Sequence, residues 1–230
     1  MIEIKEGAIF VADVHENEDR RDLFDFLDEV KSLNPPQLFL MGDIFDFLTY
    51  PAKYTLKFYK EEIEVINNLS KSIKIYYLEG NHDFNLKEIF PNIKVFPLSK
   101  QPVKVKYKEQ IGFIAHGDIF SGFKYNFFHF FLRNRYLLSF LNFVAGKKLP
   151  LYYLNKTKNK KICKKIPNFP KIIKQKVDLY DIGLSEVDFI IEGHYHQGVF
   201  FDEKCSYFNL KAYGCDKKYY QIKGDKITLI

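Results

Sequence analysis

The sequence contains no tryptophan and only three cysteines among its 230 residues, at positions 163, 205 and 215. So few and such scattered cysteines exclude a disulfide framework and a cysteine-rich zinc site, and they fit a reducing compartment. Glycine and proline are sparse as well, with 12 and 9 residues. Because 47% of the chain is hydrophobic and 17% aromatic, collagen-like and disordered classes are excluded. The length suits one compact domain, or one domain with a sizeable insertion.

Long apolar runs are also missing. No uncharged apolar stretch reaches the roughly 18 residues that a membrane-spanning helix needs. The first residues include Glu3 and Glu6 beside a short apolar run, which does not fit a secretory signal. The sequence therefore predicts a globular, cytoplasmic protein.

Acidic residues are absent from one long segment. Residues 119–177 contain 14 lysines and arginines and no aspartate or glutamate, whereas the other 171 residues carry 21 basic and 29 acidic groups. A neutral-to-acidic body thus carries one strongly basic block, which favours contact with phosphate on nucleic acid or at a membrane surface. A solvated lysine-rich face is the plainer alternative. We call residues 119–177 the insertion.

Hydrophobic periodicity predicts an α/β core. Short apolar runs at residues 7–12, 37–41 and 73–78 are typical of buried strands, and the segments 19–33 and 54–69 between them have helical spacing. This alternation predicts right-handed crossovers and a mainly parallel sheet. Further expected elements are a hairpin and five later strands, at residues 103–107 with 111–115, 188–191, 198–201, 207–211, 218–222 and 227–230.

Polar clusters follow five of the expected strands. Each cluster contains an aspartate or histidine, and five of the six histidines lie in them. Because ligands bind beyond the carboxyl ends of strands in open α/β sheets, we expect the clusters to meet at one place. In chain order the clusters are Asp13-Val14-His15, Gly42-Asp43-Ile44-Phe45-Asp46, Gly80-Asn81-His82-Asp83, His116-Gly117-Asp118 and Gly193-His194-Tyr195-His196.

The residue types in these clusters indicate a metal site. Carboxylates, imidazoles and amide oxygens are ligands for Mn, Fe, Zn or Mg. His194 and His196 stand two residues apart on an extended segment, so they point to opposite sides, which suits two ions better than one. A single carboxylate such as Asp43 can bridge both. Each motif alone has an ordinary explanation as a turn, a cap or a core histidine, but all five in this order are specific.

The five motifs resemble those of the calcineurin-type metallophosphoesterase superfamily, whose pattern D-x-H, G-D, G-N-H-[DE], H and G-H-x-H is complete between Asp13 and His196. The resemblance implies a four-layer αββα sandwich with two divalent ions, for which we expect Mn²⁺, with Fe, Zn or Mg as alternatives. It also implies that His82 faces the phosphoryl group and that Asp46 orients His82. The implied ligands are Asp13, His15, Asp43 and His196 for one ion, and Asp43, Asn81, His116 and His194 for the other.

Within the superfamily, the chain is similar to the UDP-2,3-diacylglucosamine diphosphatases of lipid A biosynthesis. The similarity rests on length, on FVADVHE, GDIFDF, GNHDF and HGD, and on a helical insertion before the final G-H-x-H. Two positions differ from the better-known branch of that group, which has arginine in place of His82 and of Gln197. The resemblance implies cleavage of UDP-2,3-diacylglucosamine to UMP and 2,3-diacylglucosamine 1-phosphate through two-metal hydroxide attack, with His82, if cationic, protonating the leaving group.

The insertion is where we expect substrate selection. Its first part is aromatic and leucine-rich, with Lys124, Arg133 and Arg135 among the aromatics as candidate substrate-binding residues beside Asn81. Such a helix is typical of an interfacial element, although a cap packed on the core is an equal alternative. We therefore expect a nucleotide–lipid substrate and peripheral contact with the anionic inner face of the cytoplasmic membrane, with no nucleic acid. The metallophosphoesterase core is expected over residues 1–118 and 178–230.

Two other functions remain open at this stage. A soluble nucleotide phosphodiesterase or nuclease would use the same chemistry and would bind phosphates through the basic block. A non-catalytic scaffold is disfavoured because every ligand position and His82 are retained.

Overall fold

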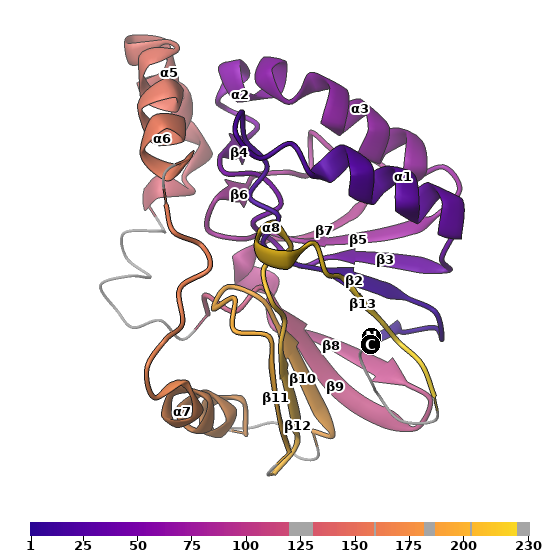
Figure 1. Cartoon of the computed structure of the whole chain (residues 1–230). Coiled ribbons are helices and arrows are strands. Elements are labelled where there is room, and N and C mark those ends of the chain that lie inside the picture. The colour runs from indigo at the N-terminus through magenta and orange to yellow at the C-terminus, as the bar shows by residue number, and fades with distance from the viewer. Residues whose placement is uncertain (120–130, 159, 182–186, 203, 225–230) are drawn as a thin grey trace.

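The computed structural model describes residues 1–119, 131–158, 160–181, 187–202 and 204–224 (Figure 1). Two sheets face each other, and helices cover their outer faces. The expected αββα sandwich is therefore confirmed. On one side the covering helices are α1 (Leu23–Leu33) and α3 (Lys60–Leu69), and on the other α7 (Phe169–Asp181).

The first sheet contains the three strands expected in the amino-terminal part. Its order is β13-β2-β3-β5-β7, and all neighbours are parallel except β13, which runs antiparallel to β2. The carboxyl ends of β2, β3 and β5 therefore share one edge, as the alternation of strands and helices predicts. The strands are β2 (Ile9–Val11), β3 (Gln37–Leu40), β5 (Lys74–Leu78), β7 (Lys94–Phe96) and β13 (Tyr220–Gln221).

The second sheet has six strands in the order β1-β8-β9-β10-β12-β11. The expected hairpin is confirmed as the antiparallel pair β8–β9, and β9, β10 and β12 are parallel. The expected strand at residues 227–230 lies outside the described residues. The strands are β1 (Ile2–Glu3), β8 (Val103–Tyr107), β9 (Gln110–Ala115), β10 (Phe189–Glu192), β11 (Val199–Asp202) and β12 (Ser206–Asn209).

Aromatic rings fill the space between the two sheets. Phe10 stacks on Phe39 at 4.3 Å between ring centroids, and Phe39 stacks on Tyr76 at 4.8 Å, so one ring from each of β2, β3 and β5 faces the second sheet. Large buried rings contribute much of the apolar area that stabilises a core. This layer holds the first sheet at a fixed distance from the second, and so fixes the edge where their loops meet.

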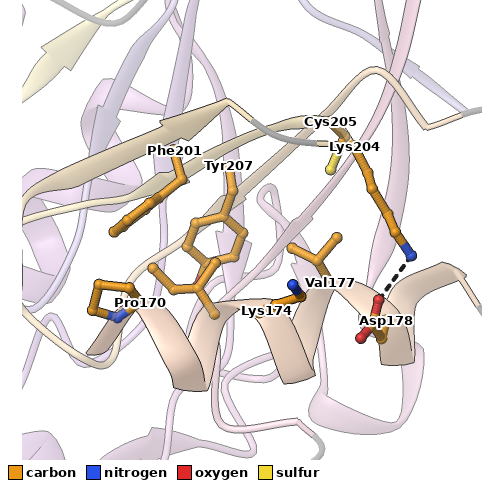
Figure 2. A pocket seen from close by; sticks show the side chains of 9 residues that line it. Pro170, Lys174, Val177, Asp178, Phe201, Lys204, Cys205 and Tyr207 are labelled. Atoms are coloured by element: carbon orange, nitrogen blue, oxygen red, sulfur yellow. Dashed lines mark hydrogen bonds and ion pairs between the residues drawn. The ribbon is translucent and has the colours of Figure 1, made fainter. Parts of the chain in front are cut away.

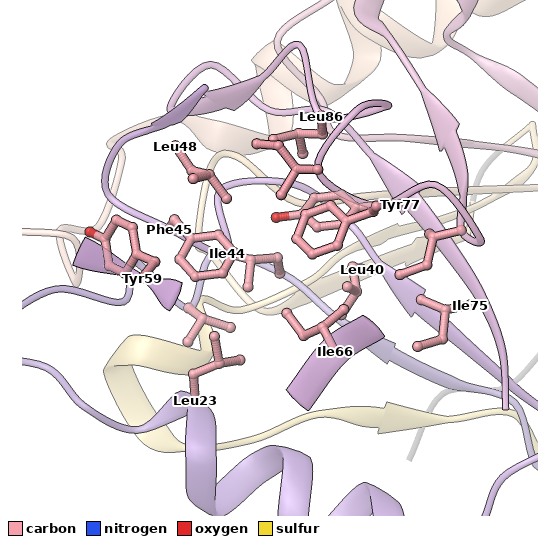
Figure 3. Close-up of a cluster of buried hydrophobic side chains, with 14 of the residues drawn as sticks. Leu23, Leu40, Ile44, Phe45, Leu48, Tyr59, Ile66, Ile75, Tyr77 and Leu86 are labelled. Carbon is pink, nitrogen blue, oxygen red and sulfur yellow. The ribbon is translucent and has the colours of Figure 1, made fainter. Parts of the chain in front are cut away.

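The outer core of the first sheet is shown in Figure 3. On α1, Leu23, Phe26, Leu27 and Val30 are buried at helical spacing, which is the stripe that the sequence predicts. The helix expected at residues 54–69 is instead two helices, α2 (Lys53–Phe58) and α3. They are separated at Tyr59, whose buried hydroxyl donates to the carbonyl of Glu16 at 2.8 Å.

The described part of the insertion contains two helices, α5 (Arg135–Ala145) and α6 (Lys148–Lys158), and most of a third, α7. Asn134 caps α5 by accepting from the N–H groups of Tyr136 and Leu137, and α5 packs beside α6. α7 instead packs on the outer face of the second sheet through Phe169, Ile173 and Tyr180. Figure 2 shows α7 against Phe201 and Tyr207 of that sheet. One outer layer of the sandwich thus lies partly within residues that we assigned to the insertion.

The expectation that the cysteines are reduced is wrong for two of the three. Cys163 and Cys215 form a disulfide that joins the segment between α6 and α7 to the short helix α8 (Tyr213–Asp216). Their distance of 52 positions along the chain hides the pairing in the sequence. Other elements that periodicity did not predict are the two-stranded sheet of β4 (Leu48–Thr49) and β6 (Asp83–Phe84), and the 3₁₀-helix Leu98–Lys100. Among the described residues, no helix is long and apolar enough to cross a membrane.

Candidate metal centre

Five loops meet at one edge of the two sheets, after β2, β3, β5, β9 and β10. Backbone hydrogen bonds join them: the N–H of Asp13 donates to Gly42 at 3.1 Å, and the N–H of Gly193 donates to His116 at 2.8 Å. The convergence predicted from strand ends is therefore present. All seven expected ligand residues lie in these loops, namely Asp13, His15, Asp43, Asn81, His116, His194 and His196.

The first cluster consists of Asp13, His15 and His196, whose ligand-type atoms lie within 4.8 Å of one another. The Nε2 atoms of His15 and His196 are 3.5 Å apart, and Nε2 of His196 lies 3.1 Å from Oδ1 of Asp13. Asp13 and His15 are fully buried. This trio matches three of the four residues implied for one ion.

The second cluster consists of Asp43, His116 and His194. Nε2 of His116 lies 3.5 Å from Oδ2 of Asp43 and 3.3 Å from Oδ1 of Asn81. A third group joins Asp43 to His15 and His82, so Asp43 lies between the two clusters. That position suits the bridging carboxylate that the sequence implies.

The proton positions on these rings favour bound cations. Nδ1 of His116 is 2.9 Å from the carbonyl of Met41, and Nδ1 of His196 is 2.6 Å from the carbonyl of Ile162. A carbonyl only accepts, so Nδ1 donates and the neutral ring keeps a lone pair on Nε2. The same holds for His15, whose Nδ1 lies 2.9 Å from Oδ1 of Asp46. When these three rings are neutral, their Nε2 lone pairs and the carboxylate oxygens of the same cluster form a donor set that fits a divalent ion, which would take the place of the proton on His116.

The backbone at the centre is strained. Five of the seven expected ligand residues have positive φ although none is glycine, with values from 52° to 65°. Such conformations cost of order 1–3 kcal/mol each and cluster at functional sites. The residues are Asp13, His15, Asp43, His194 and His196.

Glycine is needed where the loops cross. Gly42 has φ +89°, and a Cβ there would lie 2.5 Å from Nδ1 of His116. Any other residue at position 42 would displace this ring, so the glycine of the Gly-Asp motif serves the close approach of two loops.

The buried carboxylates and histidines of the centre shift the pKa of one another. Burial alone would lower the pKa of His116, but the Asp43 carboxylate raises it to about 10. Burial would raise the pKa of Asp43, yet His116 and His82 hold it well below its usual value. Burial, and then the charge of His116, lowers the pKa of His194 well below its ordinary range. The carboxylates thus draw positive charge into the site, a preference that a divalent ion would satisfy.

The role implied for Asp46 needs correction. Its carboxylate contacts His15, and its other oxygen accepts from Arg20 at 3.0 Å, so the side chain orients a member of the first cluster. His82 is held by the backbone of Asp46, because Nδ1 of His82 donates to that carbonyl at 2.8 Å. Sequence spacing alone does not distinguish a side chain from a main-chain acceptor at the same residue.

The environment of His82 favours the neutral imidazole. Burial lowers its pKa to about 4, against the expectation that Asp46 would favour the imidazolium. Its Nε2 lies 4.0 Å from Oδ2 of Asp43 and accepts from the ammonium of Lys160 at 3.2 Å. Lys160, in the segment that follows α6, therefore brings the positive charge to this position. The sequence offered no signal that distinguishes Lys160 from its neighbouring lysines.

Asp83 holds two of the loops together and was not assigned a role from the sequence. It is fully buried, and its carboxylate accepts from the N–H groups of Asp43, Ile44 and Gly80 and from the hydroxyl of Tyr77. Its place in Gly-Asn-His-Asp, directly after His82, was the available signal. Burial raises its pKa to about 7.

The three candidate substrate-binding residues of the insertion differ in position. Lys124 lies outside the described residues. Nη2 of Arg133 contacts the carbonyl of Gly80 at 2.8 Å and Oδ2 of Asp118 at 3.1 Å, so it ties two metal loops together. Arg135 pairs with Glu88 at 3.0 Å on the surface, outside the metal clusters.

This fold and this centre define a metal-dependent phosphoesterase. The chain belongs to the calcineurin-like phosphoesterase family, whose model matches residues 8–198.

Curated relatives share one name at low identity. A UDP-2,3-diacylglucosamine hydrolase of Histophilus somni (strain 129Pt) is 27% identical over 117 residues, covering 48% of this chain and 49% of that protein. The match therefore spans about half the length of that relative. One of the same name from Wigglesworthia glossinidia brevipalpis is 25% identical over 199 residues, or 83% of this chain and 79% of that protein.

The fold is also found among solved structures. The solution NMR structure of a Thermotoga maritima protein aligns with a TM-score of 0.50 and 12% identity over 98% of both chains. At that identity the likeness concerns the fold alone.

Proposed function

We propose that this protein hydrolyses the diphosphate of UDP-2,3-diacylglucosamine, giving UMP and 2,3-diacylglucosamine 1-phosphate. The observation that carries the proposal is the combination of a basic cleft, one lysine of which contacts His82, with an amphipathic groove against helix α5. A diphosphate needs the first and acyl chains need the second. The name of the curated relatives supports the same substrate.

The basic cleft has a volume of about 400 Å³. Four cationic side chains line it, and one of them, Lys160, reaches Nε2 of His82. Clustered cations with a metal centre attract a diphosphate and neutralise its charge. The cationic residues are Arg20, Lys160, Lys161 and Lys164.

The amphipathic groove has a volume of about 540 Å³ and lies between α5 and the segment around α2. Its apolar lining offers a place for hydrocarbon, at ~0.8 kcal/mol per buried methylene. Helix α6 packs beside α5 and also contacts the centre, because its Tyr153 packs against Phe47 and lies 6.2 Å from the ring of His82. The apolar lining residues are Tyr50, Pro51, Leu56 and Phe143, and the polar ones are Lys53, Arg135, Ser139 and Asn142.

The outer face of α5 and α6 supports contact with a membrane surface. Large apolar side chains project into solvent at helical spacing on α5, where Tyr136 is 80% and Phe143 87% exposed. Helix α6, beside α5, carries basic residues at both of its ends. Exposed aromatics bordered by lysines are typical of an element that binds the interface of an anionic bilayer. The apolar residues are Tyr136, Phe140, Phe143, Val144 and Tyr152, and the basic ones are Lys147, Lys148, Lys156 and Lys158.

In the proposed reaction, two bound divalent ions, Mn²⁺ in our proposal, would supply hydroxide at neutral pH and screen the phosphoryl oxygens. Asp13, His15, Asp43 and His196 would hold one ion, and Asp43, Asn81, His116 and His194 the other. The amide of Asn81 and the ammonium of Lys160 would bind phosphoryl oxygens as charge develops on them. His82 accepts from Lys160 and so keeps that ammonium beside the reacting phosphate.

A soluble nucleotide phosphodiesterase or nuclease is the alternative, because the basic cleft would bind any phosphodiester. Shortening the acyl chains of UDP-2,3-diacylglucosamine distinguishes the two. We expect kcat/KM to fall up to about fourfold for each methylene removed, the equivalent of ~0.8 kcal/mol. Bis-p-nitrophenyl phosphate serves as the reference substrate. A flat response to chain length, together with faster cleavage of single-stranded DNA or a nucleotide diester, would contradict the proposal in favour of the alternative.

Membrane contact is tested separately. Phe140→Ser, on the outer face of α5, is expected to lower binding to vesicles containing anionic lipid. Leu33→Ser is the matched control, because Leu33 is an exposed apolar residue at the end of α1, outside α5 and α6. Equal vesicle binding by both variants and the unmodified protein would refute a contact through α5.

A further inference from the structure

A buried lysine contacts two segments that adjoin ligands of the second metal cluster. Lys176, on α7, is only 4% exposed. Its ammonium donates to the carbonyl of Gly117 at 2.7 Å and to the two carboxylate oxygens of Glu192 at 2.8 and 2.7 Å. An ammonium has three N–H donors, so every donor of Lys176 is used by a partner inside the fold.

Glu192 is equally well satisfied. It is the last residue of β10 and is fully buried. Besides Lys176, its oxygens accept from the hydroxyl of Tyr180 on α7, at 2.6 Å, and from that of Tyr207 on β12. The cluster thus joins α7, β10, β12 and the loop after β9 through charge-assisted bonds, which are stronger than neutral ones.

The two anchor points of Lys176 are next to metal loops. Gly117 directly follows His116, and Glu192 stands two residues before His194. The loops also contact each other, since the N–H of Gly193 donates to the carbonyl of His116. Packing between them is tight, because a Cβ on Gly117 would lie 3.1 Å from Cβ of His194. A small shift at either anchor would therefore move a ligand ring.

We propose that Lys176 is a positioning residue for the second metal cluster. By holding Gly117 and Glu192 at once, it fixes the separation of the loops that carry His116 and His194. The inference rests on the ligand set that we propose, and it is independent of the substrate. It also gives α7 a part in the centre, although no side chain of α7 belongs to the ligand set.

Stability alone does not account for a buried pair of this kind. Taking both charges out of water offsets much of their attraction, so an apolar pair of similar volume is often as stable. The charged pair adds directional hydrogen bonds, because the three donors of the ammonium fix one carbonyl and one carboxylate in defined positions. Residues that orient metal ligands from outside the first contact layer typically change metal affinity about 10–100-fold when replaced.

The test is titration of metal-free protein with Mn²⁺ by calorimetry, on the full chain. Lys176→Met is expected to weaken the second ion at least about tenfold, while the first ion stays within about twofold. Because this variant leaves Glu192 charged and unpaired, Lys176→Met/Glu192→Gln is measured beside it. It removes both charges, and the amide keeps a partner for each tyrosine: its oxygen accepts from one hydroxyl and its NH₂ donates to the oxygen of the other. The matched control is Lys174→Met, because Lys174 is an exposed lysine of the same helix. This variant should bind both ions with normal affinity.

The outcomes separate the inference from the proposal beneath it. If the double variant folds and binds both ions as tightly as the unmodified protein, Lys176 is only structural and the inference is wrong. Failure of both variants to fold would equally overturn it, because Lys176 would then support the whole sheet rather than two loops. If the unmodified protein itself binds fewer than two ions, the proposed ligand set fails instead.

Discussion

Replacing Asp46 by asparagine would show how the first metal cluster is held. Asp46 is 1% exposed, and its neighbours act as donors toward it: Nδ1 of His15 at 2.9 Å, Arg20 at 3.0 Å and the amide of Asn17. A carboxylate accepts at every one of these contacts. An amide of the same shape has one oxygen and one NH₂. The NH₂ of the new residue would therefore face a neighbouring N–H donor, with which it cannot form a hydrogen bond.

The expected magnitude follows from the two ways that the amide can lie. With its NH₂ toward Arg20 and Asn17, the amide keeps the hydrogen bond from Nδ1 of His15. Its NH₂ then faces the N–H donors of Arg20 and Asn17, and none of the three finds an acceptor. With its NH₂ toward His15, it forces the proton of that ring onto Nε2, and the lone pair that would bind the ion is lost. Either arrangement should weaken the first ion about 10–100-fold, or roughly 1.4–2.7 kcal/mol. The second ion should change much less, since His116 and His194 do not contact Asp46.

The assay is calorimetric titration of metal-free protein with Mn²⁺. Asp25→Asn makes the same chemical change at an exposed position of α1 and should behave like the unmodified protein. The binding step missing from His196→Ala identifies the first ion. Normal Mn²⁺ affinity in Asp46→Asn, accompanied by a lower kcat, would refute this reasoning. It would indicate that the side chain of Asp46 acts on His82 instead of on the first ion.

Three further predictions concern the shared carboxylate, the disulfide and the buried tyrosines. Asp43→Ala should lose both ions and nearly all activity, whereas His82→Ala should keep both ions with lower turnover; equal metal loss by elemental analysis would make His82 a ligand. Reduction of the disulfide should lower the free energy of unfolding by up to about 4 kcal/mol, since it closes a 52-residue separation. Urea unfolding with and without dithiothreitol measures this, with Cys205→Ser as the control, and equal midpoints would contradict it. Burial raises the pKa of four tyrosines well above 10, so the folded state keeps protons that the unfolded state releases, and stability should fall as pH rises above about 10. Ultraviolet titration should show these four ionising only on unfolding; ionisation of all 16 tyrosines in the folded protein would contradict it. The four are Tyr59, Tyr77, Tyr180 and Tyr207.

The parallel sheet could be predicted from sequence because its strands are short apolar runs that end in polar clusters. The stripe of α1 and the hairpin β8–β9 follow from periodicity in the same way. Tyr59 shows the limit. Its spacing continues a helix, but its buried hydroxyl bonds to Glu16 and the helix divides there. Such a long-range contact has no signature in a window of neighbouring residues.

The candidate centre was predictable because its motifs each follow a strand, and parallel strands bring their ends together. What the motifs do not give is the partner of each side chain. The positions of Asp46, His82 and Arg133 depend on which backbone groups the folded loops present. The Lys176–Glu192 pair and the Cys163–Cys215 disulfide depend on contacts between distant segments, so sequence spacing could not indicate them.

The central claim is that the Asp43-centred site cleaves a lipid-linked diphosphate. Its most direct test is incubation of the Mn²⁺-loaded protein with UDP-2,3-diacylglucosamine, followed by product analysis. We predict equal amounts of UMP and 2,3-diacylglucosamine 1-phosphate, formed by the unmodified protein and by Asp25→Asn and absent with Asp43→Ala. An intact substrate, under conditions in which the same preparation hydrolyses bis-p-nitrophenyl phosphate, would contradict the claim.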